Sequence, residues 1–244
     1  MKASPDAQRR LLDLQAVDTA LAQLAHRRKT LPELAEIDAV SRELSALEDE
    51  RVRAQVAVDD LERDISRFEK DIEQVRIRKE RDQKRLDAGG ALKEIEGLQH
   101  ELATLNRRQS ELEDAELELM EQKESAESAL TAVRERLDAA LARRSEAEAR
   151  RDETLADITK EQEFKQSSRA PLAADLPADL VTLYDKIRLD SGLGAALFQS
   201  GRCGGCRIEL YGADLARVKA AAPDEVVRCE ECRRIMVRTK ESGL

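Results

Sequence analysis

The sequence predicts a mostly α-helical chain, in which a long antiparallel coiled-coil hairpin precedes a small C-terminal domain that mixes helix and strand. Two stretches of apolar residues at alternating three- and four-residue spacing are separated by the glycine pair Gly89-Gly90. Of the 244 residues, 38% are charged and only 2% are aromatic, which is typical of long helices and not of a large globular core. The only four cysteines lie close together near the C-terminus, in the predicted small domain.

The first predicted helix runs from about Pro5 to Lys29. Thr30 to Glu33 has the form of a capping box, with Pro32 in the first turn of whatever follows. We therefore expect either a new helix or a kink at this point. The apolar stripe of the first helix consists of Leu14, Val17, Leu21, Leu24 and Leu31.

The next stretch has the clearest heptad repeat. Ten of its 13 core positions are apolar, and a repeat sustained over this length indicates a coiled coil. These positions are Leu44, Leu47, Arg51, Ala54, Val58, Leu61, Ile65, Phe68, Ile72, Val75, Lys79, Asp82 and Leu86.

A turn near residues 87–90 separates this arm from the next. Extending the first repeat would place core residues at 93, 96 and 100, but the observed stripe resumes at Ile95, Leu98 and Leu102 and continues to Ala140. A continuous helix would also contain two glycines, at a cost of about 1 kcal/mol each. Because so short a turn makes the arms antiparallel, we expect residues 1–165 to form one hairpin.

The pattern changes after the second arm. The polar, proline-containing segment 166–175 predicts a linker, and residues 176–244 predict a separate domain with a short leading helix from about Pro177 to Arg188. Within that domain we expect strands at about 195–198, 208–210, 226–227 and 235–237, and a short helix at 214–221.

The cysteines form two C-x-x-C pairs, Cys203 with Cys206 and Cys229 with Cys232. Two such turns brought together supply four thiolates at the corners of a tetrahedron, which favours one structural Zn²⁺ in a C4 zinc ribbon. Gly204 and Gly205 suit a turn that requires positive φ. Iron and disulfide chemistry are the alternatives. Met1 to Asp13 contains no apolar run that could be a signal peptide, and no stretch of the sequence is long and apolar enough to span a membrane. We therefore expect a cytoplasmic protein with reduced thiols and no membrane partner.

The C-terminal motifs resemble those of the bacterial C4-type zinc-ribbon coiled-coil family. The segment L-P-x-x-L-x-x-x-Y-x-x-I-R from Leu176 to Arg188, the C-G-G-C pair, the R-C-x-x-C-R-R-I segment and residues 93–101 carry this resemblance. It implies that the four cysteines bind zinc, that there are no catalytic residues, and that RNA or protein partners are bound. The tail Met236-Val237-Arg238 departs from the aromatic-ended tail of the family.

Basic residues near the turn indicate a contact with nucleic acid, either RNA or DNA. Residues 76–93 contain seven basic and three acidic side chains in a chain whose net charge is −9. Against this, the chain has almost no aromatic side chains that could stack on bases. The candidate residues are Arg76, Arg78, Lys79, Arg81, Lys84, Arg85 and Lys93, with Arg233 and Arg234 in the ribbon.

The alternative is a protein-binding scaffold or chaperone without a nucleic-acid role, since Val52, Val56, Leu117 and Met120 lie outside the core stripes. The same residues are compatible with a homodimer. An enzyme is disfavoured because no glycine-rich phosphate loop follows a strand and the two histidines lie on different helices. The sequence thus predicts a non-enzymatic, zinc-binding adaptor.

Overall fold

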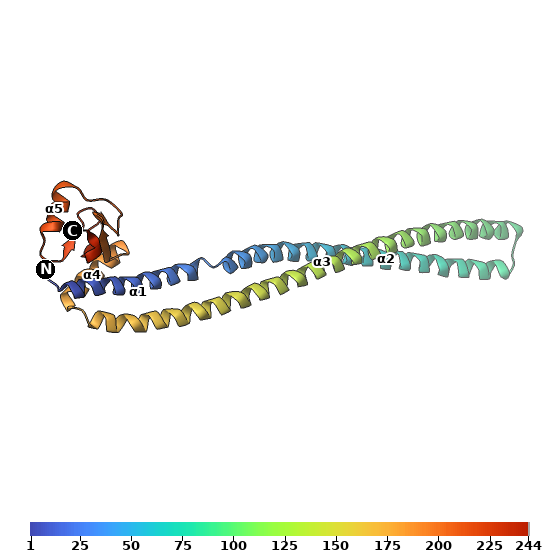
Figure 1. Ribbon diagram of the computed structural model, residues 1–244. Helices are drawn as coiled ribbons and strands as arrows, with labels where there is room; N and C mark the ends of the chain where they lie inside the picture. The colour runs from blue at the N-terminus through green and yellow to red at the C-terminus, as the bar shows by residue number, and fades with distance from the viewer. Residues whose placement is uncertain (244) are drawn as a thin grey trace. The chain divides into compact units, whose positions relative to one another are not determined.

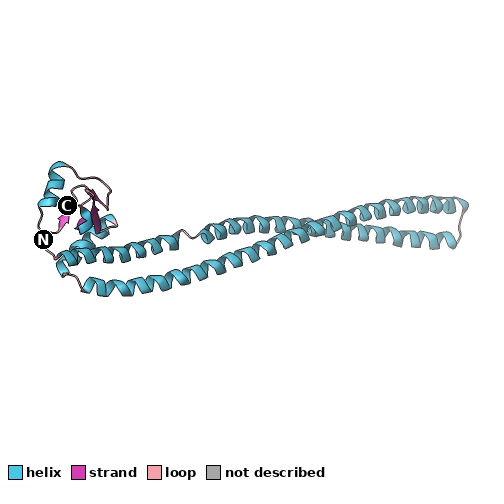
Figure 2. Cartoon of the chain, in the orientation of Figure 1, coloured by secondary structure: helices cyan, strands magenta, loops and turns pink. Residues whose placement is uncertain are grey.

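The computed structural model describes residues 1–243 and divides the chain into two compact units, one formed by Met1–Leu34 and Ala149–Leu244 and the other by Ala35–Glu148. Figure 1 shows the helices, and Figure 2 shows how little strand accompanies them. In the part of the chain that is described, no helix is long and apolar enough to cross a bilayer. The helices are α1 (Pro5–Lys29), α2 (Pro32–Asp87), α3 (Leu92–Ala174), α4 (Ala178–Ser191) and α5 (Gly212–Ala220), followed by a 3₁₀ turn at Lys240–Ser242.

The unit Ala35–Glu148 is an antiparallel coiled-coil hairpin of α2 and the first part of α3, as predicted. The connection between Asp87 and Leu92 reverses the chain, and Gly89 adopts a φ of 78° there. Side chains that approach the turn on α2 contact side chains that leave it on α3. The ion pairs that fix this register are Glu43–Arg143 (2.7 Å), Glu50–Arg136 (3.0 Å) and Glu62–Lys123 (2.8 Å).

The interior of this hairpin becomes more polar toward the turn. Farther from the turn, Val40, Leu47 and Ala140 are buried against one another. Nearer the turn, the Lys79 ammonium donates a 2.7 Å hydrogen bond to the Gln109 side-chain oxygen, and Asp82 is only 1% exposed. Both residues occupy core positions, where polar groups specify register at some cost in stability.

The break between α1 and α2 is a real helix end and not a kink. The Thr30 hydroxyl donates to the carbonyl of His26 at 3.0 Å, so it closes α1 and does not cap α2 as the capping-box pattern predicted. Leu31, which lies between α1 and α2, is buried with Leu24 of α1 and Ile158 of α3, so this connection packs against α3.

The prediction of a linker at residues 166–175 was wrong, because α3 continues to Ala174 with Pro171 inside it. A proline within a helix normally costs about 3 kcal/mol. The Ser167 and Ser168 hydroxyls both donate to the carbonyl of Phe164, about two turns before the proline, at 2.8 and 2.9 Å. We infer that tertiary contacts of residues after Ser168 outweigh the low helix propensity of this proline-containing segment.

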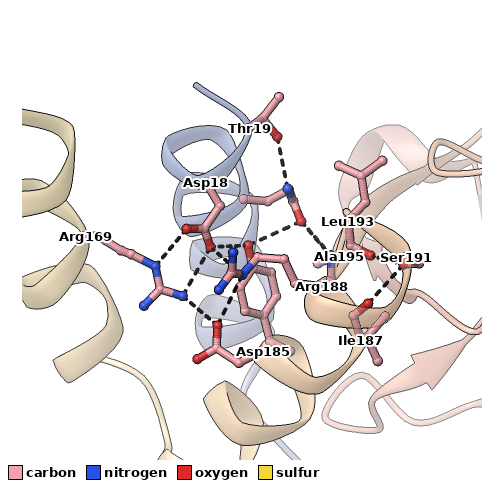
Figure 3. Close-up of polar contacts among 12 residues, drawn as sticks. Asp18, Thr19, Arg169, Asp185, Ile187, Arg188, Ser191, Leu193 and Ala195 are labelled. Carbon is pink, nitrogen blue, oxygen red and sulfur yellow. Dashed lines mark hydrogen bonds and ion pairs between the residues drawn. The ribbon is translucent and has the colours of Figure 1, made fainter. Parts of the chain in front are cut away.

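The decisive contacts form a polar cluster that joins α1, α3 and α4 (Figure 3). Asp18 is buried and accepts hydrogen bonds from Arg169 at 2.7 Å and from the Tyr184 hydroxyl at 2.8 Å. Arg169 also contacts Asp185 at 2.6 Å, and the Arg188 guanidinium lies 3.3 Å from Asp18. Every buried charge in this cluster therefore has an opposite partner, which is the condition for burying it.

A four-stranded sheet follows α4 and has the order β2-β1-β4-β3, with β1 parallel to β4 and the other pairs antiparallel. The expected return strand at 208–210 is reduced to a single antiparallel bridge, in which Glu209 lies opposite Arg202 of β2. On either side of this bridge, the Cys203 amide donates to the Ile208 carbonyl at 3.1 Å and the Leu210 amide donates to the Gly201 carbonyl at 2.8 Å. The strands are β1 (Ala195–Gln199), β2 (Arg202–Cys203), β3 (Val227–Arg228) and β4 (Ile235–Arg238).

The N-terminal segment belongs to the same unit as this sheet. The Ala3 amide donates to Asp224 at 2.8 Å, and the Val226 amide donates to Met1 at 3.1 Å. Leu11 and Leu14 of α1 are fully buried in a cluster with residues of α4, β1 and β4. The compact units thus differ from the expected division into residues 1–165 and 176–244, because amphipathic patterns do not reveal which helix the ribbon packs against.

Candidate metal centre

The four cysteine sulfurs converge on one point within the ribbon. One ligand atom from each lies within 4.8 Å of the others, with Cys203–Cys232 at 3.7 Å and Cys206–Cys229 at 3.9 Å. Zinc–sulfur bonds of about 2.3 Å in a tetrahedron place sulfurs about 3.8 Å apart. The arrangement therefore fits a single Zn²⁺ with four thiolate ligands, as the sequence predicted.

The two C-x-x-C turns have the same backbone geometry. In the first, the Arg207 amide donates to the Cys203 carbonyl at 2.7 Å, and in the second the Arg233 amide donates to the Cys229 carbonyl at 2.9 Å. Arg207 and Arg233 have positive φ values of 63° and 62°. Non-glycine residues rarely adopt this conformation, so the closed turn must stabilise it.

The glycines of the first turn provide space and not positive φ, contrary to our expectation. A Cβ on Gly204 would lie 2.6 Å from the carbonyl oxygen of Leu197, whose hydrogen bond from the Gly204 amide is 2.8 Å long. A Cβ on Gly205 would lie 2.7 Å from the Arg234 side chain. The turn thus packs directly on β1 and on the second turn.

Burial and hydrogen bonding set the acidity of the cysteine thiols. Burial raises the pKa of Cys203, and it raises the pKa of Cys229 to about 12. Burial acts in the same direction on Cys232, but hydrogen bonds from the Arg234 amide and the neighbouring thiols outweigh it and hold the pKa of Cys232 below its ordinary value. Zinc binds the thiolate forms, so it must displace the proton of a buried thiol such as Cys229, whose pKa is raised.

A small core supports the cysteines. Cys203 and Cys229 are fully buried with Phe198, Val218 and Met236. Zinc supplies a structural cross-link here, because four protein thiolates leave no coordination position for water or a substrate.

Arg238 connects α5 to this core in a way that the sequence did not reveal. Its guanidinium donates to four carbonyl groups at or just after the end of α5, at 2.6 to 3.2 Å. Such contacts satisfy carbonyls that a helix end leaves without partners. The acceptors are the carbonyls of Val218, Ala221, Ala222 and Glu225.

The basic residues predicted near the turn are mostly engaged in contacts of their own. Arg76 pairs with Glu73 and Glu80, and Arg78 pairs with Glu101. Arg85 pairs with Glu94 at 3.4 Å. Each of these cations already has a partner, which weakens it as a phosphate contact.

The other candidates divide into two groups. Lys79 lies in the hairpin interior, Arg233 pairs with Glu230 at 3.3 Å, and Arg234 donates to the Ser191 carbonyl at 3.1 Å. Lys84 and Lys93, in contrast, are exposed and have no carboxylate within 4.0 Å among the described residues.

Sequence reasoning missed Arg67 and Lys70, which are also exposed and likewise lack a carboxylate within 4.0 Å in the described chain. With Arg81 and Lys84 they follow a second three- and four-residue spacing on the outward face of α2, interrupted only by Gln74 and Ile77. We call Arg67, Lys70, Arg81 and Lys84 the basic stripe. The three- and four-residue spacing of the basic stripe is present in the sequence. A count of the basic residues near the turn, however, does not separate the stripe from the arginines that form ion pairs.

This fold and site define a coiled-coil hairpin protein with a C4 zinc ribbon. The chain matches the CT398-like coiled coil hairpin domain over residues 14–192 and the C4-type zinc ribbon domain over residues 202–236. It therefore belongs to the CT398-like coiled-coil hairpin family.

Three relatives show how far the likeness extends. The uncharacterized protein Rv2229c of Mycobacterium tuberculosis is 41% identical over 239 residues, which cover 98% of each chain. A solved structure from Mycobacterium smegmatis is 37% identical, with a TM-score of 0.88 over 98% of this chain and 100% of that one. CT398 from Chlamydia trachomatis, 21% identical over 96% of this chain and 98% of its own, shares the fold with a TM-score of 0.70.

Proposed function

We propose that the protein is a non-enzymatic adaptor that binds RNA along the basic stripe of α2, while the zinc ribbon serves as a structural module. The observation that carries the proposal is the stripe itself. Three of its four cations have no carboxylate within 4.0 Å in the part of the chain that is described, and the fourth, Arg81, lies 3.5 Å from the buried Asp82.

The shape of the stripe supports a linear polyanion as the partner. Its residues extend over about 25 Å of one helix face, at about 1.5 Å of rise per residue. Successive phosphates of an RNA strand can follow such a line, and each contact gains free energy by releasing a counterion. The absence of aromatic side chains from the stripe favours contact with the phosphate backbone over base recognition.

Only some of the basic residues predicted from the sequence belong to the proposed RNA contact. Arg81 and Lys84 belong to the stripe, and the exposed Lys93 lies beyond its end, after the turn. Arg76, Arg78 and Arg85 are left out of the proposed contact, because each is paired with a carboxylate of α2 or α3. We expect a cytoplasmic location, where RNA is available.

Fluorescence anisotropy with a labelled single-stranded RNA of mixed sequence tests the proposal. Changing all four stripe residues to Gln should weaken binding at least tenfold at about 50 mM salt. The logarithmic salt dependence should lose a slope of about 3, since each contact to a single strand contributes about 0.7.

A matched variant controls for net charge. Changing Arg28, Arg42, Arg53 and Lys160 to Gln removes four exposed cations that, among the described residues, make no ion pair between the two arms of the hairpin, and it should leave RNA affinity within about twofold. Equal weakening in both variants would place the contact outside the stripe. No RNA binding by the unmodified protein would favour the alternative, a protein scaffold without a nucleic-acid role.

A further inference from the structure

A second outward surface lies on α3, within the hairpin unit, and differs in charge from the basic stripe. Residues 111–127, green in Figure 1, contain eight acidic residues and one basic residue, Lys123. Lys123 points into the hairpin interface and is already paired with Glu62 and Glu127. The outward side of this segment is therefore almost purely anionic.

Two large apolar side chains are exposed within this anionic segment. Leu117 is 58% exposed and Met120 is 51% exposed, and both lie outside the heptad core positions of α3. Neither side chain gains much from the hydrophobic effect in the hairpin alone, because about half of its surface stays in water.

The carboxylates around this apolar pair have no cationic partners. Among the residues that the structure describes, no Lys, Arg or His nitrogen lies within 4.0 Å of Asp114, Glu118, Glu121 or Glu124. Their spacing of three and four residues places them beside one another on one helix face, where like charges repel by about 0.2–0.5 kcal/mol per pair. Elsewhere on the hairpin, carboxylates such as Glu43 and Glu50 pair across to the opposite helix.

We define the acidic face as Asp114, Leu117, Glu118, Met120, Glu121 and Glu124. The acidic face combines exposed apolar surface with negative charge that has no cationic partner. A ligand that covers the face must therefore bury the apolar surface and also supply positive charge. We propose that the acidic face binds a basic amphipathic helix of a protein partner, whose apolar side chains cover Leu117 and Met120 while its Lys and Arg residues pair with the surrounding carboxylates.

The length, the methionine side chain and the charge of the acidic face all favour a basic amphipathic helix as its ligand. It extends about 15 Å along α3, which matches about three turns of a partner helix laid against it. Methionine adapts its shape to different apolar partners, which suits a surface that receives a side chain from outside. The charge excludes RNA and anionic lipid as ligands here.

A divalent cation fits the face poorly. Among the described residues, only the four cysteines bring three or more potential metal ligands together, so the carboxylates of α3 do not converge on a point. A second copy of this chain, offering Ile77 and the basic stripe of α2, is the remaining competitor and is separated by the test below.

The test uses the full-length protein and a synthetic helical peptide of about five turns, with leucine on one face and lysine on the other. Isothermal titration should show saturable binding. A peptide with glutamate in place of lysine should not bind, and a peptide of the same composition in scrambled order should bind at least tenfold more weakly.

Two variants of the protein test the two components of the face. Changing Leu117 and Met120 to Gln should weaken peptide binding at least fivefold without changing net charge. Changing Asp114 to Asn and Glu118, Glu121 and Glu124 to Gln should weaken it at least tenfold. The control changes Glu135, Glu146 and Glu153 to Gln and Asp138 to Asn, removing the same charge elsewhere on α3, and should stay within about twofold.

Three results would overturn the proposal. Unchanged affinity in both face variants would place the peptide elsewhere, and equal weakening in the control would show a response to net charge only. If sedimentation of the unmodified protein showed self-association that either face variant abolished, the occupant would be a second copy. RNA binding is measured in parallel, and the face variants should retain it, so failure here is distinguishable from failure of the proposed function.

Discussion

The hydroxyl of Tyr184 donates a 2.8 Å hydrogen bond to Asp18, a residue 166 positions earlier in the chain. Through this contact the helix that leads into the ribbon is fixed to the first helix of the protein. Asp18 also holds Arg169 of α3, so one buried carboxylate connects three helices.

Asp18→Asn should destabilise the unit that contains the ribbon by about 3 kcal/mol, because the half-buried Arg169 and Arg188 lose their charged partner. Tyr184→Phe should cost about 1 kcal/mol, because Asp18 keeps its two arginines. Urea unfolding of both variants measures the difference. A cost for Asp18→Asn no larger than that for Tyr184→Phe would contradict the assigned roles.

The same contact predicts a loss of stability at alkaline pH. Burial, and then the hydrogen bond to Asp18, raise the pKa of Tyr184 far above its usual value of about 10. The folded state keeps the phenol proton while the unfolded state loses it, so this stabilisation is present below about pH 10 and is lost as pH rises further. Melting temperatures between about pH 8 and 11 should fall more steeply for the unmodified protein than for Tyr184→Phe.

Tyr211→Phe provides the control for that measurement, because Tyr211 is the only other tyrosine and lies on the surface. Its removal should change the alkaline slope less than the removal of Tyr184 does. Parallel slopes for the unmodified protein and Tyr184→Phe would show that the phenol is not protected.

Gly194→Ala should destabilise the protein by about 1–3 kcal/mol, because an added Cβ would lie 2.5 Å from the Tyr184 ring and 2.7 Å from its carbonyl oxygen. Gly97→Ala should instead stabilise by about 0.5–1 kcal/mol, since this glycine lies in α3 with nothing within 4 Å of the added atom. Thermal unfolding compares the two substitutions, and the same sign of shift in both would contradict the packing described.

Zinc removal should have a local effect. A chelator, or Cys203→Ser, should increase hydrogen exchange between residues 200 and 234, where the metal replaces a larger apolar core. Residues 35–148 should exchange as before, because they form a separate compact unit. Hydrogen-exchange mass spectrometry resolves the two regions, and a loss of protection throughout the hairpin would show that the units are coupled.

Features that depend on a repeat or a fixed spacing could be predicted from the sequence. The heptads of α2 and α3 predicted the hairpin because apolar seams tolerate few other arrangements. The glycine pair predicted the turn, and the two C-x-x-C pairs predicted the zinc site because tetrahedral ligands restrict the spacing.

Contacts between distant polar residues could not be predicted in this way. Asp18 and Arg169 look like ordinary surface charges in a chain that is 38% charged, yet their contact joins α1 to the C-terminal part of α3. Likewise, the pairing of Arg78 with Glu101 depends on the register of the hairpin, which a list of basic residues does not contain. The outward stripe of Arg67, Lys70, Arg81 and Lys84 becomes visible only after the paired arginines are set aside.

Ultraviolet cross-linking of the protein to RNA in living cells, followed by mass spectrometry of the cross-linked peptides, tests the proposed function most directly. We expect cross-links in peptides that cover residues 67–84 of α2, and we expect these cross-links to be lost when the four stripe residues are changed to Gln. Recovery of no cross-linked RNA, or of cross-links confined to the ribbon and unaffected by those changes, would contradict the proposed function.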